Sequence, residues 1–127
     1  MKQRQIKFMV WESIGRRMYT DSYMRDVLNY DDLLLNGAIN WHVLQFAGFY
    51  AKDEREIYEG DIINFGGYNL AVVFQKGEFV GKFKEEIEDE TIPGFIIRHE
   101  ADKFEIVGNV FENLDLVSST SILPKKS

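Results

Sequence analysis

The sequence predicts a mainly β protein of the α+β class, in which a small SH3-like β-barrel follows an N-terminal β-hairpin and a short helical segment. Two observations support this prediction. Short apolar stretches recur at about ten-residue spacing between turns, as in a β-meander. The Gly60-Asp61 step also leads directly into Ile62 and Ile63, whose β-branched side chains suit a strand.

The first predicted strand covers residues 6–11. One of its faces carries Met9 and Trp11, which makes that face unusually apolar for a surface in contact with water. We therefore expect the second face to be covered as well, with Met18 and Tyr19 returning after a turn as the partner strand of a hairpin.

Residues 21–35 favour a short helix, because apolar side chains recur there at helical rather than strand spacing, and Asp21 or Ser22 would cap it. The Asn36-Gly37 pair then indicates a tight turn. Residues 38–46 alternate well enough between apolar and polar side chains to form a strand.

The barrel is predicted over residues 55–117. Gly60 would turn the chain with a positive φ, and Asp61 would accept hydrogen bonds from nearby amides. The segment 84–91 holds five carboxylates, which favours an exposed loop or a short surface helix. The later strands are expected at residues 70–74, 78–83, 95–97 and 104–111.

These patterns divide the chain into three parts. Residues 1–54 form an N-terminal strand and helix region with contacts between subunits, and residues 55–117 form the barrel. Residues 118–127 change to serine, threonine and lysine and are expected to be a flexible tail, although Ile122 and Leu123 could dock on a neighbour.

Composition narrows the function classes. The absence of cysteine excludes a disulfide scaffold, thiolate zinc sites and cysteine catalysis. The N-terminus has no apolar segment of the signal-peptide kind, and no stretch has the roughly 18 to 20 apolar residues of a membrane span. We therefore expect a cytoplasmic protein with no membrane contact.

The charge is unevenly placed. The net charge is −6, and residues 61–127 carry 7 basic and 12 acidic side chains. Because an acidic surface repels phosphate, nucleic-acid binding is disfavoured unless a basic patch near the N-terminus acts alone. The basic residues of that region are better explained as the polar groups of an exposed strand.

Four segments in order carry a resemblance to a known family: residues 6–11, 45–48, 56–62 and 105–113. Together they resemble the YopX family of phage and prophage proteins, over roughly residues 4–116. The resemblance implies a location in the cytosol of a bacterial host and a tendency to form homo-oligomers. It implies no reaction, since no established activity goes with the family.

No catalytic, cofactor or metal site is predicted. Carboxylates and two histidines are present, but His42 and His99 have none of the spacings that bind metals. The Gly66-Gly67 pair is followed by strand residues instead of a phosphate-binding helix, so it indicates a hairpin turn. A small enzyme would need paired carboxylates such as Asp61 and Glu112 in one pocket.

The candidate binding residues are aromatic or lie beside Gly60: Trp11, Trp41, Tyr58, Glu59 and Asp61. Rings on a small barrel can bind peptides or single-stranded nucleic acid, but they also fill cores and subunit interfaces, and we favour the latter. The leading hypothesis is a non-enzymatic, self-assembling phage accessory protein. The alternative is an adaptor that binds a host or phage protein, or nucleic acid, through barrel loops.

Overall fold

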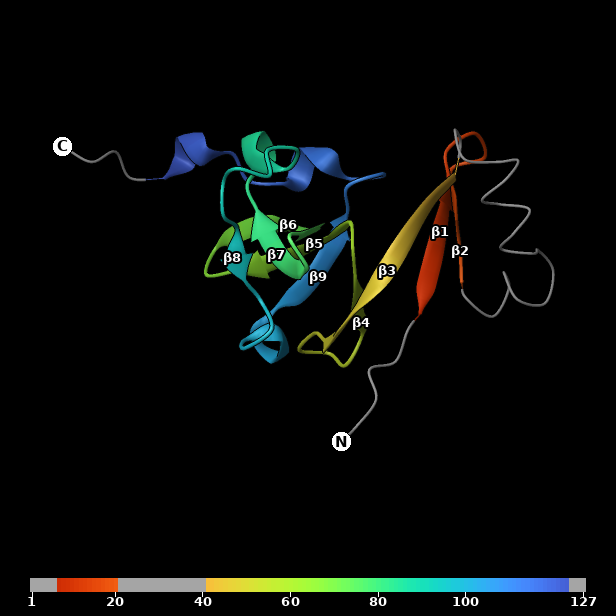
Figure 1. The fold of residues 1–127 in the computed structure, drawn as a ribbon, viewed down its shortest axis with the longest axis horizontal. Helices are drawn as coiled ribbons and strands as arrows, with labels where there is room; N and C mark the ends of the chain where they lie inside the picture. The colour runs from red at the N-terminus through yellow and green to blue at the C-terminus, as the bar shows by residue number, and fades with distance from the viewer. Residues whose placement is uncertain (1–6, 21–40, 124–127) are drawn as a thin grey trace.

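The computed structural model describes residues 7–20 and 41–123. In these ranges the chain is mainly β, with two antiparallel sheets and a few short 3-10 turns (Figure 1). The predicted helix at 21–35 and the turn at 36–37 lie outside the described residues. None of the described segments is a helix long and apolar enough to cross a membrane.

The first sheet has the strand order β2-β1-β3-β4. Its strands are β1 (Phe8–Glu12), β2 (Arg17–Tyr19), β3 (Trp41–Tyr50) and β4 (Glu56–Tyr58). β1 pairs with β2 on one side, placing Trp11 opposite Met18, and with β3 on the other. Trp11 is buried, as the apolar second face of this strand predicted.

The second sheet has the order β8-β7-β6-β5-β9. Its strands are β5 (Asp61–Phe65), β6 (Tyr68–Gln75), β7 (Glu78–Lys82), β8 (Phe95–Ile96) and β9 (Glu105–Asn109). All four strands predicted after residue 70 are confirmed, with ends shifted by a few residues.

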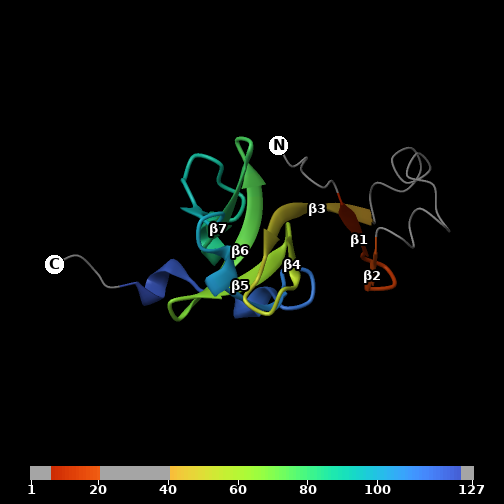
Figure 2. The ribbon, with the colours of Figure 1, turned by 90° about the horizontal axis from the view of Figure 1, so that it is seen from below.

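Strand β3 pairs with different strands along its length. Residues 41–45 pair with β1, whereas Phe46 and Tyr50 pair with β4, and the register shifts between those two residues. Gly48 has a φ of 87° at this irregularity, a conformation that other residues rarely adopt. The bend carries the strand from the outlying pair β1-β2 into the half-barrel (Figure 2). We call residues 8–19 and 41–45 the arm, which comprises β1, β2, the turn between them and the start of β3. We call residues 46–117 the half-barrel.

The main core lies where the two sheets pack on each other. Ala47 and Ile57 come from the first sheet, and Ala51 directly follows β3. They meet Ile63 and Leu70 from the second sheet. The cluster also contains Val72 and five buried side chains from residues 79–104. The predicted boundary at residues 54/55 therefore falls between two strands, β3 and β4, that pair in one sheet and share one core.

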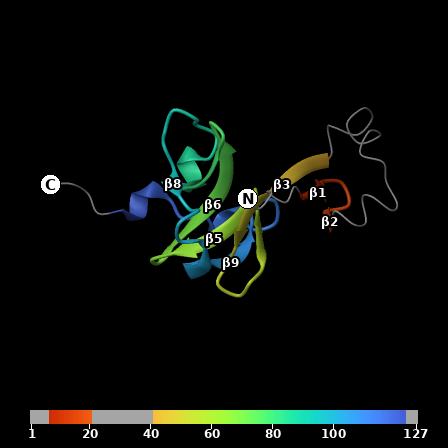
Figure 3. The same cartoon turned by 60° about the horizontal axis from the view of Figure 1, so that its bottom comes forward.

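The acidic segment forms the 3-10 turn η1 (Lys84–Glu86) and an exposed loop, as predicted. The first part of the predicted tail is hydrogen-bonded to the half-barrel. The amide of Ser118 donates to Asn69 O, and its carbonyl accepts from Lys84 N, at 2.8 and 2.9 Å. Residues 120–122 then form the 3-10 turn η4 (Thr120–Ile122), which projects on the side away from the arm (Figure 3). Two further 3-10 turns are η2 (Ala101–Lys103) and η3 (Leu114–Leu116).

Candidate functional site

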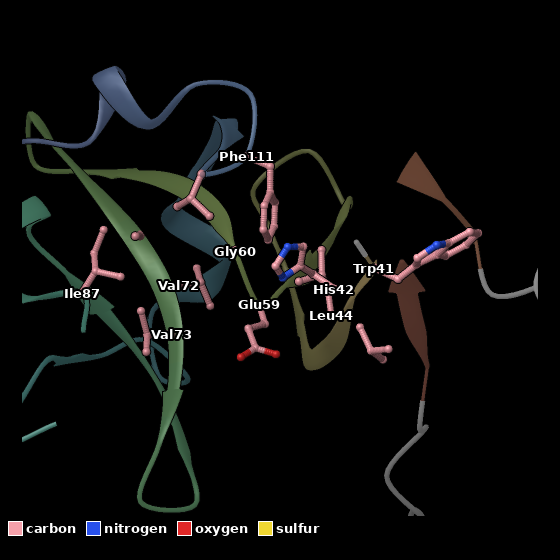
Figure 4. Close-up of a pocket in the computed structure, with 12 residues that line it drawn as sticks. Trp41, His42, Leu44, Glu59, Gly60, Val72, Val73, Ile87 and Phe111 are labelled. Atoms are coloured by element: carbon pink, nitrogen blue, oxygen red, sulfur yellow. The ribbon is translucent and has the colours of Figure 1, made fainter. Parts of the chain in front are cut away.

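A cleft of about 440 Å³ lies where the arm meets the half-barrel. One wall is the start of β3 and the other is the outer face of β6, with the turn before β5 and the chain after β9 closing the ends (Figure 4). Its volume falls within the roughly 300–1,000 Å³ typical of ligand sites. Its lining includes the side chains of His42, Leu44, Glu59, Val73, Ile87 and Phe111.

Gly60 holds this end of the cleft together through its backbone. Its N–H donates to Val72 O and its carbonyl accepts from Val110 N, both at 2.8 Å. Gly60 has a φ of 90°, as its predicted role in a turn requires. A Cβ at this position would lie 3.0 Å from the Phe111 ring, so the missing side chain also makes room for that ring.

Phe111 closes one end of the cleft and is held between two other rings. Its centroid is 5.5 Å from that of Trp11, in a stacked arrangement, and 5.3 Å from that of His42. The Asn109 side chain accepts from the Phe111 amide at 3.0 Å and so caps the turn that carries this ring. Trp11 thus supports the cleft wall from behind.

Glu59 places a carboxylate in a cleft whose described lining is mainly apolar. Figure 4 shows it below His42, between the β3 wall and the β6 wall. Its amide donates to Gln45 O at 2.9 Å, which fixes the backbone on which the side chain sits. Burial raises the pKa of Glu59 above its usual range, and a hydrogen bond with the Gln45 backbone partly opposes this. The charge is therefore incompletely solvated.

Asp61 has a structural role beside the cleft. Its carboxylate accepts from the Tyr58 amide at 2.8 Å, as predicted, and so closes the turn between β4 and β5. Burial raises the pKa of Asp61 to about 6, although the Tyr58 hydrogen bond and the nearby Arg55 charge act in the opposite direction. Asp61 does not belong to the described residues that line the cleft.

The five predicted binding residues therefore separate. Trp41 and Glu59 line the cleft, and the Trp41 ring stacks on Tyr19 with centroids 5.7 Å apart. Trp11 and Tyr58 are 3% and 8% exposed, so they support neighbouring residues and cannot offer a surface to a ligand. Asp61 holds the turn. Among the described residues, the structure thus brings only two of the five to the cleft.

Sequence reasoning missed most of the cleft wall. His42, Val72, Val73, Ile87 and Phe111 come from strands and loops far apart in the chain. One weak signal was available, because Ile87 is the single apolar residue within the acidic segment 84–91. Nothing in the pattern of the other four distinguishes a cleft residue from a core residue.

The metal site and the carboxylate pair considered in the sequence analysis are not formed by the described residues. No group of three or more histidine, aspartate or glutamate side chains is placed there to hold a metal ion. Glu112 is exposed and accepts from Asn109 Nδ2 at 3.3 Å, while Asp61 is engaged with Tyr58. The Gly66-Gly67 pair has φ values of 56° and 90° between β5 and β6, so it is a hairpin turn as predicted.

Comparison with known proteins identifies a family and a fold. The family model described as YopX protein matches residues 3–118. The crystal structure of protein EF1440 from Enterococcus faecalis superimposes with a TM-score of 0.58 at 14% identity, covering 91% of this chain and 100% of that one. A search of curated proteins finds no match.

The four segments that carry the family resemblance meet around Gly60. Residues 56–62 contain Gly60 itself, and residues 105–113 supply Val110 and Phe111. Residues 45–48 supply the Gln45 carbonyl that binds Glu59 N, and residues 6–11 supply Trp11 behind Phe111. The segments thus build one end of a single cleft.

Proposed function

This chain belongs to the YopX family, and on that premise we propose that it is a non-enzymatic phage accessory protein that works as a binding adaptor. The cleft between β3 and β6 holds part of a host or phage protein. One observation carries the proposal: in the part of the chain that the structure describes, the cleft joins mainly apolar walls to one incompletely solvated carboxylate, Glu59, which is the usual composition of a binding pocket.

This proposal reverses the order of the two hypotheses favoured by the sequence alone. The sequence predicts self-assembly through aromatic and Leu-rich N-terminal surfaces, of which Leu33–Leu35 lie outside the described residues. Among the described aromatic side chains, Trp11 stacks on Phe111, and Trp41 stacks on Tyr19. Both pairs are satisfied within one chain, so a binding role for the cleft needs fewer assumptions.

Self-assembly stays as a second candidate because of a different feature. Strand β8 pairs with β7 on one side and is the last strand of its sheet. Its side chains Phe95 and Ile96 are 50% and 51% exposed. An apolar edge strand is a natural place for a second chain to pair. We further propose that the half-barrel is SH3-like and that the protein acts in the cytoplasm of the bacterial host.

A photo-crosslinking amino acid at His42, in the cleft, tests the two candidates in host cells that carry the phage genes. The matched control places the same amino acid at Lys103, which is exposed in the turn η2. A discrete adduct with another protein at position 42 and not at position 103 supports the adaptor. An adduct of two copies trapped from position 96 supports self-assembly, and no adduct at position 42 argues against the adaptor.

A further inference from the structure

We propose that the occupant of the cleft is a basic side chain of the partner protein, arginine better than lysine, with its aliphatic stem on the apolar walls and its charged head at Glu59. This inference rests on the proposed binding function and names the chemistry that the cleft recognises.

The walls fit the stem of such a side chain. Leu44 and Val72 are buried behind the cleft surface, while Val73 and Ile87 are partly exposed on the β6 side. Long basic side chains bury their methylene groups along apolar surfaces and keep the charged group in a polar place. The cleft volume of about 440 Å³ leaves room for one long side chain and the backbone that carries it.

The polar end fits a cation. Among the described residues that line the cleft, Glu59 is the only acidic one, and no lysine or arginine is present. Glu59 is half-buried, so its carboxylate has lost part of its contact with water. A charge-assisted hydrogen bond from a guanidinium would compensate for that loss. An anionic ligand would instead place two negative charges together.

The rings favour arginine over lysine. Phe111 and His42 form a pair of rings at the end of the cleft, with centroids 5.3 Å apart. A planar guanidinium can stack on an aromatic face while it donates hydrogen bonds in its own plane, which an ammonium group cannot do. Because Phe111 has Trp11 on one side and His42 on the other, the ring open to such a contact is that of His42, which is exposed and is supported by Phe111.

The surrounding charge acts in the same direction. Ile87 lines the cleft and is flanked in sequence by Glu86 and Glu88, which belong to the acidic segment. With a net charge of −6, the chain attracts basic partners over distances longer than a contact. A basic peptide segment is therefore attracted toward the cleft by the acidic surface, and its side chain can pair with Glu59 inside the cleft.

The experiment is a titration of the ¹⁵N-labelled full chain, followed by amide chemical shifts. The probe is an acetylated and amidated five-residue peptide with arginine between alanines. Its twin carries citrulline, which has nearly the same shape and no charge. We expect the arginine peptide to shift the amides of Gly60, Val73 and Phe111 and to bind about tenfold more tightly than its twin, the effect of one charge-assisted hydrogen bond.

Two variants separate the cleft from general attraction to an acidic protein. Glu59→Gln should remove the tenfold advantage of arginine. Glu105→Gln removes the same charge from a side chain that is 65% exposed on β9, and should leave the advantage intact. The comparison of the two peptides on the unaltered chain needs no variant, so it holds even where Glu59→Gln unfolds the protein.

Each other outcome overturns the inference in a recognisable way. Equal binding of both peptides in the cleft would leave the adaptor function standing and remove the charge recognition. Shifts spread over the residue 84–91 loop instead of the cleft would show attraction alone. Cleft shifts that appear on raising the protein concentration would make a second copy the occupant. No shift with either peptide would also refute the inference, and the crosslinking at His42 then decides the adaptor function separately.

Discussion

The arm and the half-barrel are both antiparallel sheet, yet they are stabilised differently. Eleven buried side chains, drawn from both sheets, form one cluster in the half-barrel. The buried residues described in the arm are Val10, Trp11 and Leu44, and the arm also exposes Ile14 at 75% and Val43 at 39%. Figure 1 shows β1 and β2 standing to one side of the half-barrel.

This difference shows where stability and recognition reside. A sheet that shares a core with a second sheet loses much free energy when one of its side chains is cut back, whereas an outlying hairpin does not. The cleft lies at the junction, so it combines a wall from β6, which is paired on both sides, with a wall from the bent strand β3. The predictions below test that division.

The largest effect should come from the half-barrel core. Leu70 is 1% exposed, so Leu70→Ala should lower the free energy of unfolding by about 2–5 kcal/mol through lost burial and a cavity. In the arm, Val43→Ala shortens a side chain that is 39% exposed, and it should change the free energy of unfolding by about 0.5 kcal/mol or less. Urea unfolding followed by circular dichroism measures both. Similar losses would mean that the two regions do not differ in packing.

The second effect depends on pH and concerns Asp61 at the junction. Its pKa is about 6 in the folded chain against 3.8 for the free group. The folded state therefore binds the proton more tightly, and the stability from this group is complete below pH 3.8 and lost as the pH rises through 6. The size is on the order of 2–3 kcal/mol.

Asp61→Asn tests this directly, because an amide oxygen can still accept the Tyr58 hydrogen bond without carrying a charge. We expect the variant to be more stable than the natural chain at pH 7 and about equal to it at pH 4. Urea midpoints at both pH values give the answer, and Asp115→Asn, at an exposed aspartate, is the control. An unchanged pH dependence in Asp61→Asn would assign the effect to other groups.

The third effect concerns the room that Gly60 leaves for Phe111. Gly60 and Gly67 both have a φ of 90°, but a Cβ at Gly67 would meet nothing within 4 Å, whereas one at Gly60 meets the Phe111 ring. Both alanine variants should cost about 1 kcal/mol from backbone strain. Gly60→Ala should cost about 1 kcal/mol more, from the ring contact.

Fluorescence distinguishes the two glycine variants independently of stability. Trp11 stacks on Phe111, so Gly60→Ala should shift tryptophan emission and Gly67→Ala should not. Equal emission and equal stability in the two variants would show that Phe111 adapts freely, and that the cleft wall is not rigid.

The smallest effect is expected where residues 118–123 meet the half-barrel. Ser119 Oγ donates to Glu85, and Thr120 N donates to the same carboxylate at 2.8 Å. These hydrogen bonds lower the pKa of Glu85 to about 2. Ser119→Ala should raise it toward the ordinary value of 4.5, while Ser121→Ala should leave it unchanged. A ¹³C titration of the Glu85 carboxyl measures both, and a pKa unmoved in Ser119→Ala would contradict the contact.

Much of the half-barrel could be predicted from local pattern. Strands such as residues 70–74 and 78–83 are short, mainly apolar runs on either side of a short turn, and Gly60, Gly66 and Gly67 adopt the positive φ values that their turns need. The roles of Asp61 and Asn109 as hydrogen-bond acceptors in turns were also local, because each partner lies within three residues.

The candidate site could not be predicted in the same way. The place of Glu59 beside Gly60 and the ring of Trp41 both indicate a binding role, but Trp11 and Tyr58 have equal aromatic character and are buried. A side chain's type does not reveal which neighbour will cover it. That depends on how the two sheets are placed, and here the Trp11–Phe111 contact joins residues one hundred positions apart.

The sequence by itself determined the mainly β class, the order of most strands, the turns and the family, because these follow from short-range periodicity and from residues with special backbone freedom. Only the tertiary structure decided that β3 bends at Gly48 from the arm into the half-barrel and that Phe111 packs between Trp11 and His42. These features, and the cleft with Glu59 inside it, arise from long-range packing, in which each contact depends on all the others being in place.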